Sequence, residues 1–409
     1  MIKKILDNTI AKEDGQSLPE SSITSKFSLN RLENFPKILF YIFALLLPVW
    51  FAPINIGVEF SREISFSAIA VLALLLWLLR ILSKGEIYFR NSIIFIGIAI
   101  FLLVSFASAI FSANPLHSMF FSDTTPEKVS TFLLGAVIMF LVSGISRDQT
   151  YGIKALFMLI FASALSGLYS LLHFFNIIRL PFEFTRSVDF NVIGTANGLA
   201  LFYSAILLIC LSSLATERGK TSLFPKSINL AFLIASLIFI FNLAVINYQF
   251  AWIVLLLGSV FILGLKFTLD QPGRLVLNKR TVFMLSIIVL SILMILIRTP
   301  LFKSMAFPIE ISPSASATIN ISKSVMKEGV KSMLLGSGPA TFGIDFGRYK
   351  DPSINATQFW SLRFNQGFSY VLTILATNGI LGFLALVSFL GLLLFTFLKF
   401  ILEKRSDSL

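Results

Sequence analysis

Basic side chains gather in the longest polar stretch of the chain. Between Thr299 and Gln366 there are seven Lys or Arg residues against four Asp or Glu residues. The planar guanidinium fork matches the oxygens of phosphate and pyrophosphate, so this set predicts contact with a phosphorylated ligand. The alternative is a solvated face, or lysines that reach along apolar surface. The cations we expect at the ligand are Arg186 and Arg363, helped by Lys323, Lys327, Arg348 and Lys350.

Two glycine-rich segments could bring the backbone close to such an anion. Gly336-Ser-Gly-Pro-Ala-Thr-Phe-Gly343 offers Gly338 and Thr341, because glycine permits positive φ and close approach. A helix C-cap explains Gly336 equally well. Gly194-Thr-Ala-Asn-Gly-Leu-Ala200 begins an apolar run and offers Asn197. Tight packing of its small residues is the alternative.

Few other residues suit catalysis. His117 and His173 are the only histidines and have no acidic neighbour at helical spacing, so they predict no metal site; His117 is a candidate general base. The single cysteine, Cys210, lies in an apolar run and predicts neither a disulfide nor a Cys-based metal site. The sequence contains no phosphate loop, no His-Glu-x-x-His and no Gly-x-Ser-x-Gly motif. We expect neither a metal nor a cofactor.

The chain that must position these residues is mostly apolar. It has 409 residues, 56% hydrophobic and 13% charged, which is too little charge to cover a soluble domain. A bilayer-spanning helix needs about 20 apolar residues, and unpaired backbone groups exclude open strands in lipid. We therefore predict an all-α polytopic membrane protein with about ten transmembrane helices, at residues 37–56, 65–82, 92–112, 129–146, 153–174, 193–214, 228–247, 249–268, 281–298 and 380–400.

The loops between these runs predict the orientation. Lys and Arg are concentrated in alternate loops and near the C-terminus, and by the positive-inside rule that side is the cytoplasm. Both termini are then cytoplasmic. The net charge of +12 could suggest nucleic acid as the partner, but its placement in these loops indicates a bilayer instead. The residues concerned are Arg80, Lys84, Arg90, Arg147, Lys154, Arg218, Lys220, Lys226, Lys266, Arg274, Lys279, Arg280, Lys404 and Arg405.

This pattern predicts one transmembrane domain with short polar ends. Residues 1–35 are expected to form a flexible cytoplasmic arm, 36–400 a single helical domain, and 401–409 a cytoplasmic tail. The predicted spans contain almost no acidic residues. Because proton- and sodium-coupled transporters usually need carboxylates within the membrane, this argues against such a transporter.

Residues 299–379 should form a large, partly helical external loop before the last span. Ile319, Met326, Val330, Met333 and Leu334 predict one amphipathic helix along the membrane surface, ending at Gly336, with Lys323, Lys327 and Lys331 beside its apolar face. A second, short helix from Gly367 to Thr377 should break at Asn378-Gly379. A break at membrane depth is tolerated on protein or at a cavity, so we expect it beside the working site.

Three segments, in this order, carry a resemblance. They are Arg186 with Ile193-Gly-Thr-Ala-Asn-Gly-Leu-Ala200, Leu335-Gly-Ser-Gly-Pro-Ala-Thr-Phe342, and Leu375-Ala-Thr-Asn-Gly-Ile-Leu-Gly382. They resemble the arginine with Gly-Thr-x-x-Asn, the Gly-x-Gly-x-x-x-Phe turn and the closing Gly-x-x-Gly of the O-antigen ligase and O-antigen polymerase group of bacterial membrane glycosyltransferases. The resemblance covers roughly residues 92–400.

The resemblance implies transfer of a glycan from a polyprenyl-pyrophosphate carrier to an acceptor hydroxyl. The reaction would take place on the outer face of the cytoplasmic membrane, without a metal. Outer arginines would stabilise the charge that builds on the departing pyrophosphate, and a general base would take the acceptor proton.

Three positions, in two segments, depart from the family pattern. Where ligases carry a His-Asn pair, this chain has Phe368 and Ser369, and Gln249 stands where a second arginine is expected. Arg363 and Asn365, just upstream, are the candidates to replace them. The rival interpretations are a flippase or permease for a lipid-linked sugar, which predicts polar groups at mid-bilayer, and a non-catalytic membrane protein of envelope assembly.

Overall fold

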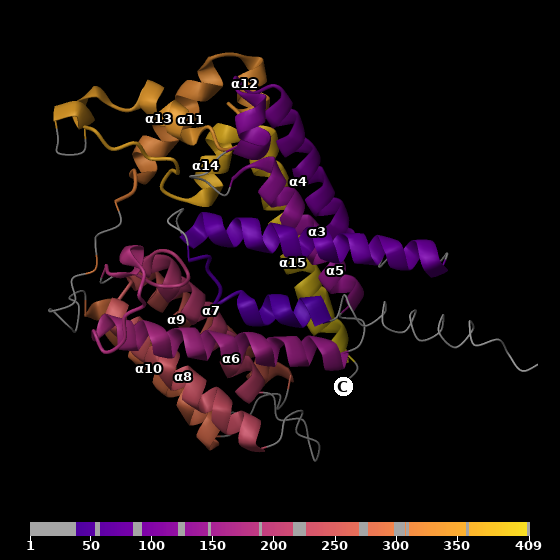
Figure 1. Cartoon of the computed structure of the whole chain (residues 1–409), viewed down its shortest axis with the longest axis vertical. Coiled ribbons are helices and arrows are strands. Elements are labelled where there is room, and N and C mark those ends of the chain that lie inside the picture. Colours follow the sequence, from indigo (N-terminus) through magenta and orange to yellow (C-terminus); the bar gives the residue numbers. More distant parts are fainter. Residues whose placement is uncertain are drawn as a thin grey trace, which may run out of the picture.

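The computed structural model describes residues 38–53, 58–84, 92–121, 127–145, 149–187, 190–215, 226–269, 277–297, 307, 311–356 and 360–406. Regular structure in these ranges is helical throughout (Figure 1). Eight of the described helices are long and apolar enough to cross a bilayer, which confirms the predicted multi-pass, all-α class but not ten spans. They are α3 (Val58–Lys84), α4 (Ile93–Ile110), α6 (Gln149–Phe174), α7 (Ala196–Ala215), α8 (Lys226–Ile246), α9 (Gln249–Leu269), α10 (Lys279–Leu296) and α15 (Gly379–Ser406). The predicted arm at 1–35 and the end of the predicted tail lie outside the described residues.

Two of the ten predicted spans, 37–56 and 129–146, are not among these eight helices. The described helical residues of the first span are 38–46, followed by a turn at 47–49. Pro48 lacks a backbone N–H and disfavours helical geometry in the residue before it, which accounts for the early end. The fourth span is α5 (Val129–Ile145), a helix of 17 residues.

Helix α3 begins earlier than predicted. The hydropathy of the chain placed its start at residue 65, but the helix begins at Val58. Glu59, Arg62 and Glu63 therefore belong to the first turns of this helix, ahead of the predicted span. Charged residues lower the local hydropathy, so hydropathy alone could not include them in the span.

The long helices form two groups (Figure 1). Helices α6 to α10 make one group, in which α7 contacts α8, α9 and α10. The large side chains at its centre, Tyr203, Phe239 and Trp252, are fully buried. Helix α4 packs along α15 and α5 in the other group, and α5 also contacts α3.

The stretch between α10 and α15, which the sequence predicts to be external and which we call the external stretch, folds against the end of the second group. Between α10 and α15 it forms α11 (Ala315–Lys327), α12 (Val330–Leu335), α13 (Phe342–Tyr349), the 3-10 turn η3 (Pro352–Ala356) and α14 (Tyr370–Thr377). Helix α14 packs on α11 and α15, and α12 packs on α15 and α4. The described residues of the predicted loop therefore form a helical layer, and α14 ends at Asn378 as predicted.

The predicted single amphipathic helix in this layer is wrong. Gly329, with φ of 156°, separates α11 from α12. The buried face of α11 consists of Thr318, Ile321, Ser322 and Val325, whereas Val330 on α12 is 69% exposed. The change of axis at Gly329 removes the continuous helical register on which the predicted apolar face depended.

Candidate functional site

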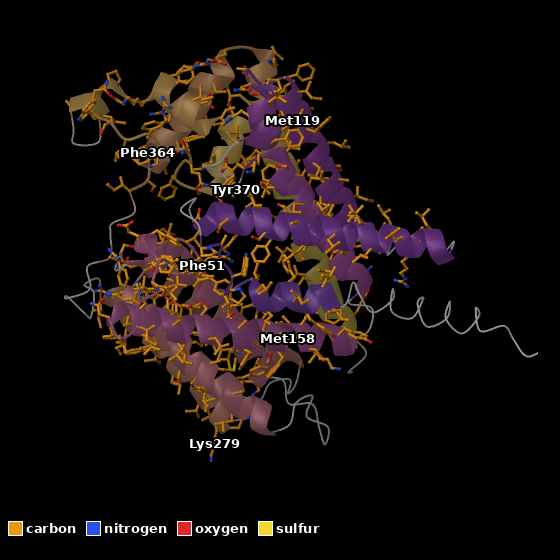
Figure 2. All side chains as sticks on the ribbon, viewed as in Figure 1. Phe51, Met119, Met158, Lys279, Phe364 and Tyr370 are labelled. Carbon is orange, nitrogen blue, oxygen red and sulfur yellow. The ribbon has the colours of Figure 1, made fainter. Side chains whose placement is uncertain are left out.

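A cavity of about 1100 Å³ lies where α3, α7 and the external stretch meet. Its three main walls are the first turns of α3, the start of α7, and residues 363–368. In the view of Figure 2, Phe364 of the external stretch and Phe51 lie on opposite sides of the N-terminal end of α3. The polar lining residues are Glu59, Arg62, Glu63, Thr131, Thr195, Asn197, Ser312, Arg363, Asn365 and Gln366, with Tyr248 contributing its ring and hydroxyl.

The cavity brings together three of the residues that the sequence predicted. Arg363 and Asn365 come from the external stretch, and Asn197 comes from the first turn of α7. Arg363 is exposed and belongs to the cavity lining. Asn365 is half-buried, and its Oδ1 lies 2.5 Å from where a Cβ on Gly343 would stand. Gly343 therefore gives Asn365 room against the start of α13.

Two threonines hold the 363–368 wall in place. The Phe368 N–H donates to Thr318 Oγ1 of α11 at 2.9 Å, and the Gly367 N–H donates to Thr373 Oγ1 of α14 at 3.0 Å. The ring of Phe364 packs edge-on against Phe346, with centroids 5.1 Å apart. The wall that carries Arg363 is thus fixed by α11, α13 and α14 together.

The α7 wall presents the N-terminus of a helix. Thr195 Oγ1 accepts from the Gly198 N–H at 3.1 Å, which caps the first turn. Asn191 Oδ1 accepts from the N–H groups of Ile193 and Gly194, at 3.0 and 2.9 Å, and so fixes the turn that leads into the helix. Because Thr195, Asn197 and Gly198 line the cavity, the positive end of the α7 dipole faces it.

Arg62 joins three segments at the α3 wall. Its Nη1 donates to the carbonyls of Val192 and Ile193, at 3.1 and 3.0 Å, and its Nη2 donates to the carbonyl of Leu47. The guanidinium thereby holds the turn before α7 and the turn after residues 38–46 onto α3. Arg62 therefore positions these two turns, and it also lines the cavity.

Two carboxylates of α3 line the cavity in different surroundings. Glu63 forms an ion pair with Lys128 at 3.0 Å and accepts from Thr131 Oγ1 at 2.7 Å. Glu59 is exposed, and its Oε1 lies 2.5 Å from where a Cβ on Gly194 would stand. Glu59 therefore sits against the turn that precedes α7.

Sequence reasoning missed Glu59, Arg62 and Glu63. The available signal was their spacing: charges three and four residues apart, followed by Phe66, share one face of a helix. An apolar run follows directly, so a helix entering the membrane would carry them at its rim. Because the predicted span started at residue 65, these three charged residues were not assigned to a helix.

The glycine-rich turn at 336–338 is not part of the cavity lining. The Ser337 N–H donates to the Ala376 carbonyl at 3.2 Å, and the Gly338 N–H donates to the Thr377 carbonyl at 2.8 Å. Thr341 Oγ1 donates back to the Gly338 carbonyl. The turn is thus buried against the end of α14, and the structure gives Gly338 and Thr341 packing roles rather than access to a ligand.

The break between α14 and α15 is buried beside this turn. We expected it beside the working site, but its residues do not line the cavity. Asn378 Nδ2 donates to Ser105 Oγ of α4 at 2.9 Å, and Ser108 Oγ donates to the carbonyls of Leu335 and Thr377 at 2.6 and 3.1 Å. We call this set of contacts, residues 334–338 with 376–379 and Ser105 and Ser108, the junction.

The remaining predicted residues lie away from the cavity lining. Arg348 pairs with Glu328 at 3.9 Å, and Lys350 Nζ donates to the Trp360 carbonyl at 3.1 Å. Lys323 and Lys327 are exposed on α11. Arg186 is exposed at the end of the 3-10 turn η2 (Glu183–Thr185).

His117 also lies outside the lining. It begins the short π-helical turn η1 (His117–Phe121), and its Nε2 lies 3.3 Å from the Ala340 carbonyl. That contact ties the segment after α4 to the glycine-rich turn.

Comparisons of the chain with protein-family models, with curated proteins and with solved structures each found no match.

Proposed function

We propose that this chain transfers a glycan from a polyprenyl-pyrophosphate-linked donor to an acceptor hydroxyl, at the outer face of the bacterial cytoplasmic membrane. The observation that carries the proposal is the shared cavity of Arg363 and the α7 N-terminus. A guanidinium and a helix N-terminus are both suited to bind phosphate oxygens. Placed at a departing pyrophosphate, they would stabilise the charge that develops in the transition state.

The size and mixed lining of the cavity support the same substrate class. About 1100 Å³ exceeds the space of a simple anion and accommodates sugar units beside a pyrophosphate. Apolar side chains, among them Phe60, Leu201 and Phe250, line it together with the polar ones. A donor with a polar head and a hydrocarbon carrier would meet both kinds of surface.

The proposal can be tested in membranes that contain the full chain and are supplied with a radiolabelled glycan on undecaprenyl pyrophosphate. We expect the label to leave the carrier and appear on other glycans or lipids. Arg363→Ala should slow this transfer about 100-fold, the usual cost of removing a charge-stabilising group. Arg179→Ala is the matched control, because Arg179 is exposed, binds Asn176 and does not line the cavity. Label that stays on the carrier with the wild-type chain would refute the proposal.

One observation favours a flippase for lipid-linked sugars as the second candidate. Glu127, before α5, is 1% exposed, and neither of its carboxylate oxygens has a hydrogen-bond partner among the described residues. Burial raises its pKa to about 8, so this carboxyl can exchange a proton near neutral pH, and the next residue, Lys128, pairs with Glu63 of the cavity lining. A labelled donor that crosses proteoliposome membranes intact, without transfer of its glycan, would support this candidate instead.

A further inference from the structure

A glycosyl transfer to a hydroxyl needs a group that takes the hydroxyl proton. From the resemblance, a histidine is expected near residue 368. The chain has Phe368 there, and this residue lines the cavity. The described lining residues include no histidine, aspartate or cysteine. Their carboxylates are Glu59 and Glu63, both on α3.

The surroundings of Glu63 make it a structural carboxylate. Its ion pair with Lys128 and its hydrogen bond from Thr131 occupy both of its oxygens. The Lys128 side chain is only 5% exposed, so loss of the Glu63 charge would leave a buried ammonium without its partner. A carboxylate held in this way is poorly placed to pick up and release a proton in each turnover.

Glu59 has the access that Glu63 lacks. It is exposed and one turn nearer the helix start, its Oε1 lies against Gly194, and the Arg62 guanidinium is close enough to interact electrostatically with it. The next residues after Gly194, Thr195 to Gly198, form the α7 wall, and the 363–368 wall lines the same cavity. A sugar whose pyrophosphate is held by Arg363 and the α7 N-terminus would therefore have a carboxylate in the same space.

We infer that Glu59 is the proton acceptor of the reaction, an inference that rests on the proposed function. The acceptor O–H bond breaks, and its proton goes to a carboxylate oxygen of Glu59. The acceptor oxygen bonds to the anomeric carbon of the donor sugar, while the bond from that carbon to the pyrophosphate oxygen breaks. The bonding pair leaves with the pyrophosphate, and Glu59 then releases its proton to water.

The test uses the same membranes and labelled undecaprenyl-pyrophosphate-linked glycan, with the transfer rate measured from about pH 5 to pH 9. Glu59→Gln should lower the rate at saturating donor about 100-fold or more, as is typical for loss of a general base. It should also remove the acidic limb of the pH profile. Glu59→Asp should restore part of the rate together with that limb. Undecaprenyl pyrophosphate should bind Glu59→Gln as it binds the wild type, because the inferred role concerns the acceptor.

Glu183→Gln is the matched control, since Glu183 is an exposed carboxylate outside the cavity lining. Its rate and pH profile should equal those of the wild type. A Glu59→Gln chain with wild-type rate and pH profile would overturn the inference and leave the proposed function standing. A wild-type chain that transfers no label would overturn both.

Discussion

The turn at residues 336–338 and the turn at residues 194–195 have similar sequences but different surroundings in the structure. Each pairs glycine with a hydroxyl residue, and each was a candidate for contact with a ligand. In the structure, the first turn is buried in the junction, where its N–H groups bind the carbonyls at the end of α14. The second turn lies against the cavity and precedes the open first turn of α7. A glycine-rich pattern therefore indicates close approach of something to the backbone, and the fold decides whether that is protein or ligand.

The largest effect should come from a side chain added in the junction. Gly379 has φ of 66°, and a Cβ there would stand 2.5 Å from the Leu334 carbonyl atoms. Gly379→Ala should cost about 3 kcal/mol of folding free energy or prevent folding, because backbone on both sides must move. Thermal unfolding in detergent, followed by size-exclusion chromatography, measures this.

Gly347→Ala is the control for this substitution. Gly347 lies inside α13, and a Cβ there would meet nothing within 4 Å. This variant should be as stable as the wild type or gain about 0.5–1 kcal/mol from the better helix propensity of alanine. If Gly379→Ala instead stays fully stable but loses glycan transfer, the junction acts on the substrate and the contrast between the two turns fails.

The next largest effect separates the two arginines that the sequence singled out. Arg363 lines the cavity and Arg186 does not. We expect Arg363→Ala to slow transfer about 100-fold and Arg186→Ala to slow it less than about tenfold, with little change in the stability of either variant because both side chains are exposed. Equal losses in the transfer assay would extend the binding site to η2, as the resemblance predicts.

The folding stability should depend on pH through a buried carboxyl next to the junction. Asp345 is 2% exposed, and burial raises the pKa of its carboxyl to about 7, against the hydrogen bond from Ser337 that lowers it. The unfolded chain ionises Asp345 first, so stability should fall by about 2 kcal/mol as the pH rises from about 5 to 7, and this group adds no further change above that. Asp345→Asn should lose this slope when unfolding is measured at several pH values. A variant with the same slope as the wild type would assign it to another group.

The smallest effect concerns the exposed cations of the external stretch. Arg348 and Glu328 lie 3.9 Å apart with side chains 55% and 38% exposed, so solvent screens most of their attraction. Arg348→Ala should change the folding free energy by no more than about 0.5 kcal/mol. A clear loss of glycan transfer in this stable variant would show that the basic set reaches the substrate outside the cavity.

Local pattern predicted much of the fold, within limits that have physical causes. Long apolar runs gave the membrane helices, because hydropathy is a property of each run alone. Gly336 and Asn378 ended helices as predicted. The start of α3 and the split at Gly329 were missed. At the start of α3, charged residues belong to the same helix as the apolar run. At Gly329, a single glycine separates α11 from α12 and changes the helix axis.

The candidate site was predicted in part. Arg363, Asn365 and Asn197 were chosen by residue type and resemblance, and all three line the cavity. Glu59, Arg62 and Glu63 were not, because they were placed in a loop before the predicted span. Gly338 and Thr341 were expected at a ligand but do not line the cavity. The Gly338 N–H binds the distant Thr377 carbonyl, and Thr341 Oγ1 binds the carbonyl of Gly338.

The sequence by itself determined that the chain is a bundle of apolar helices with a basic, partly helical stretch before the last one. These properties follow from neighbours along the chain, where hydrophobic periodicity and charge act locally. The tertiary structure alone decided which polar groups share a cavity. Arg62 reaches carbonyls 130 residues away, and the 363–368 wall is fixed by a threonine 50 residues before it. Contacts of that range depend on how helices pack, and no local pattern records them.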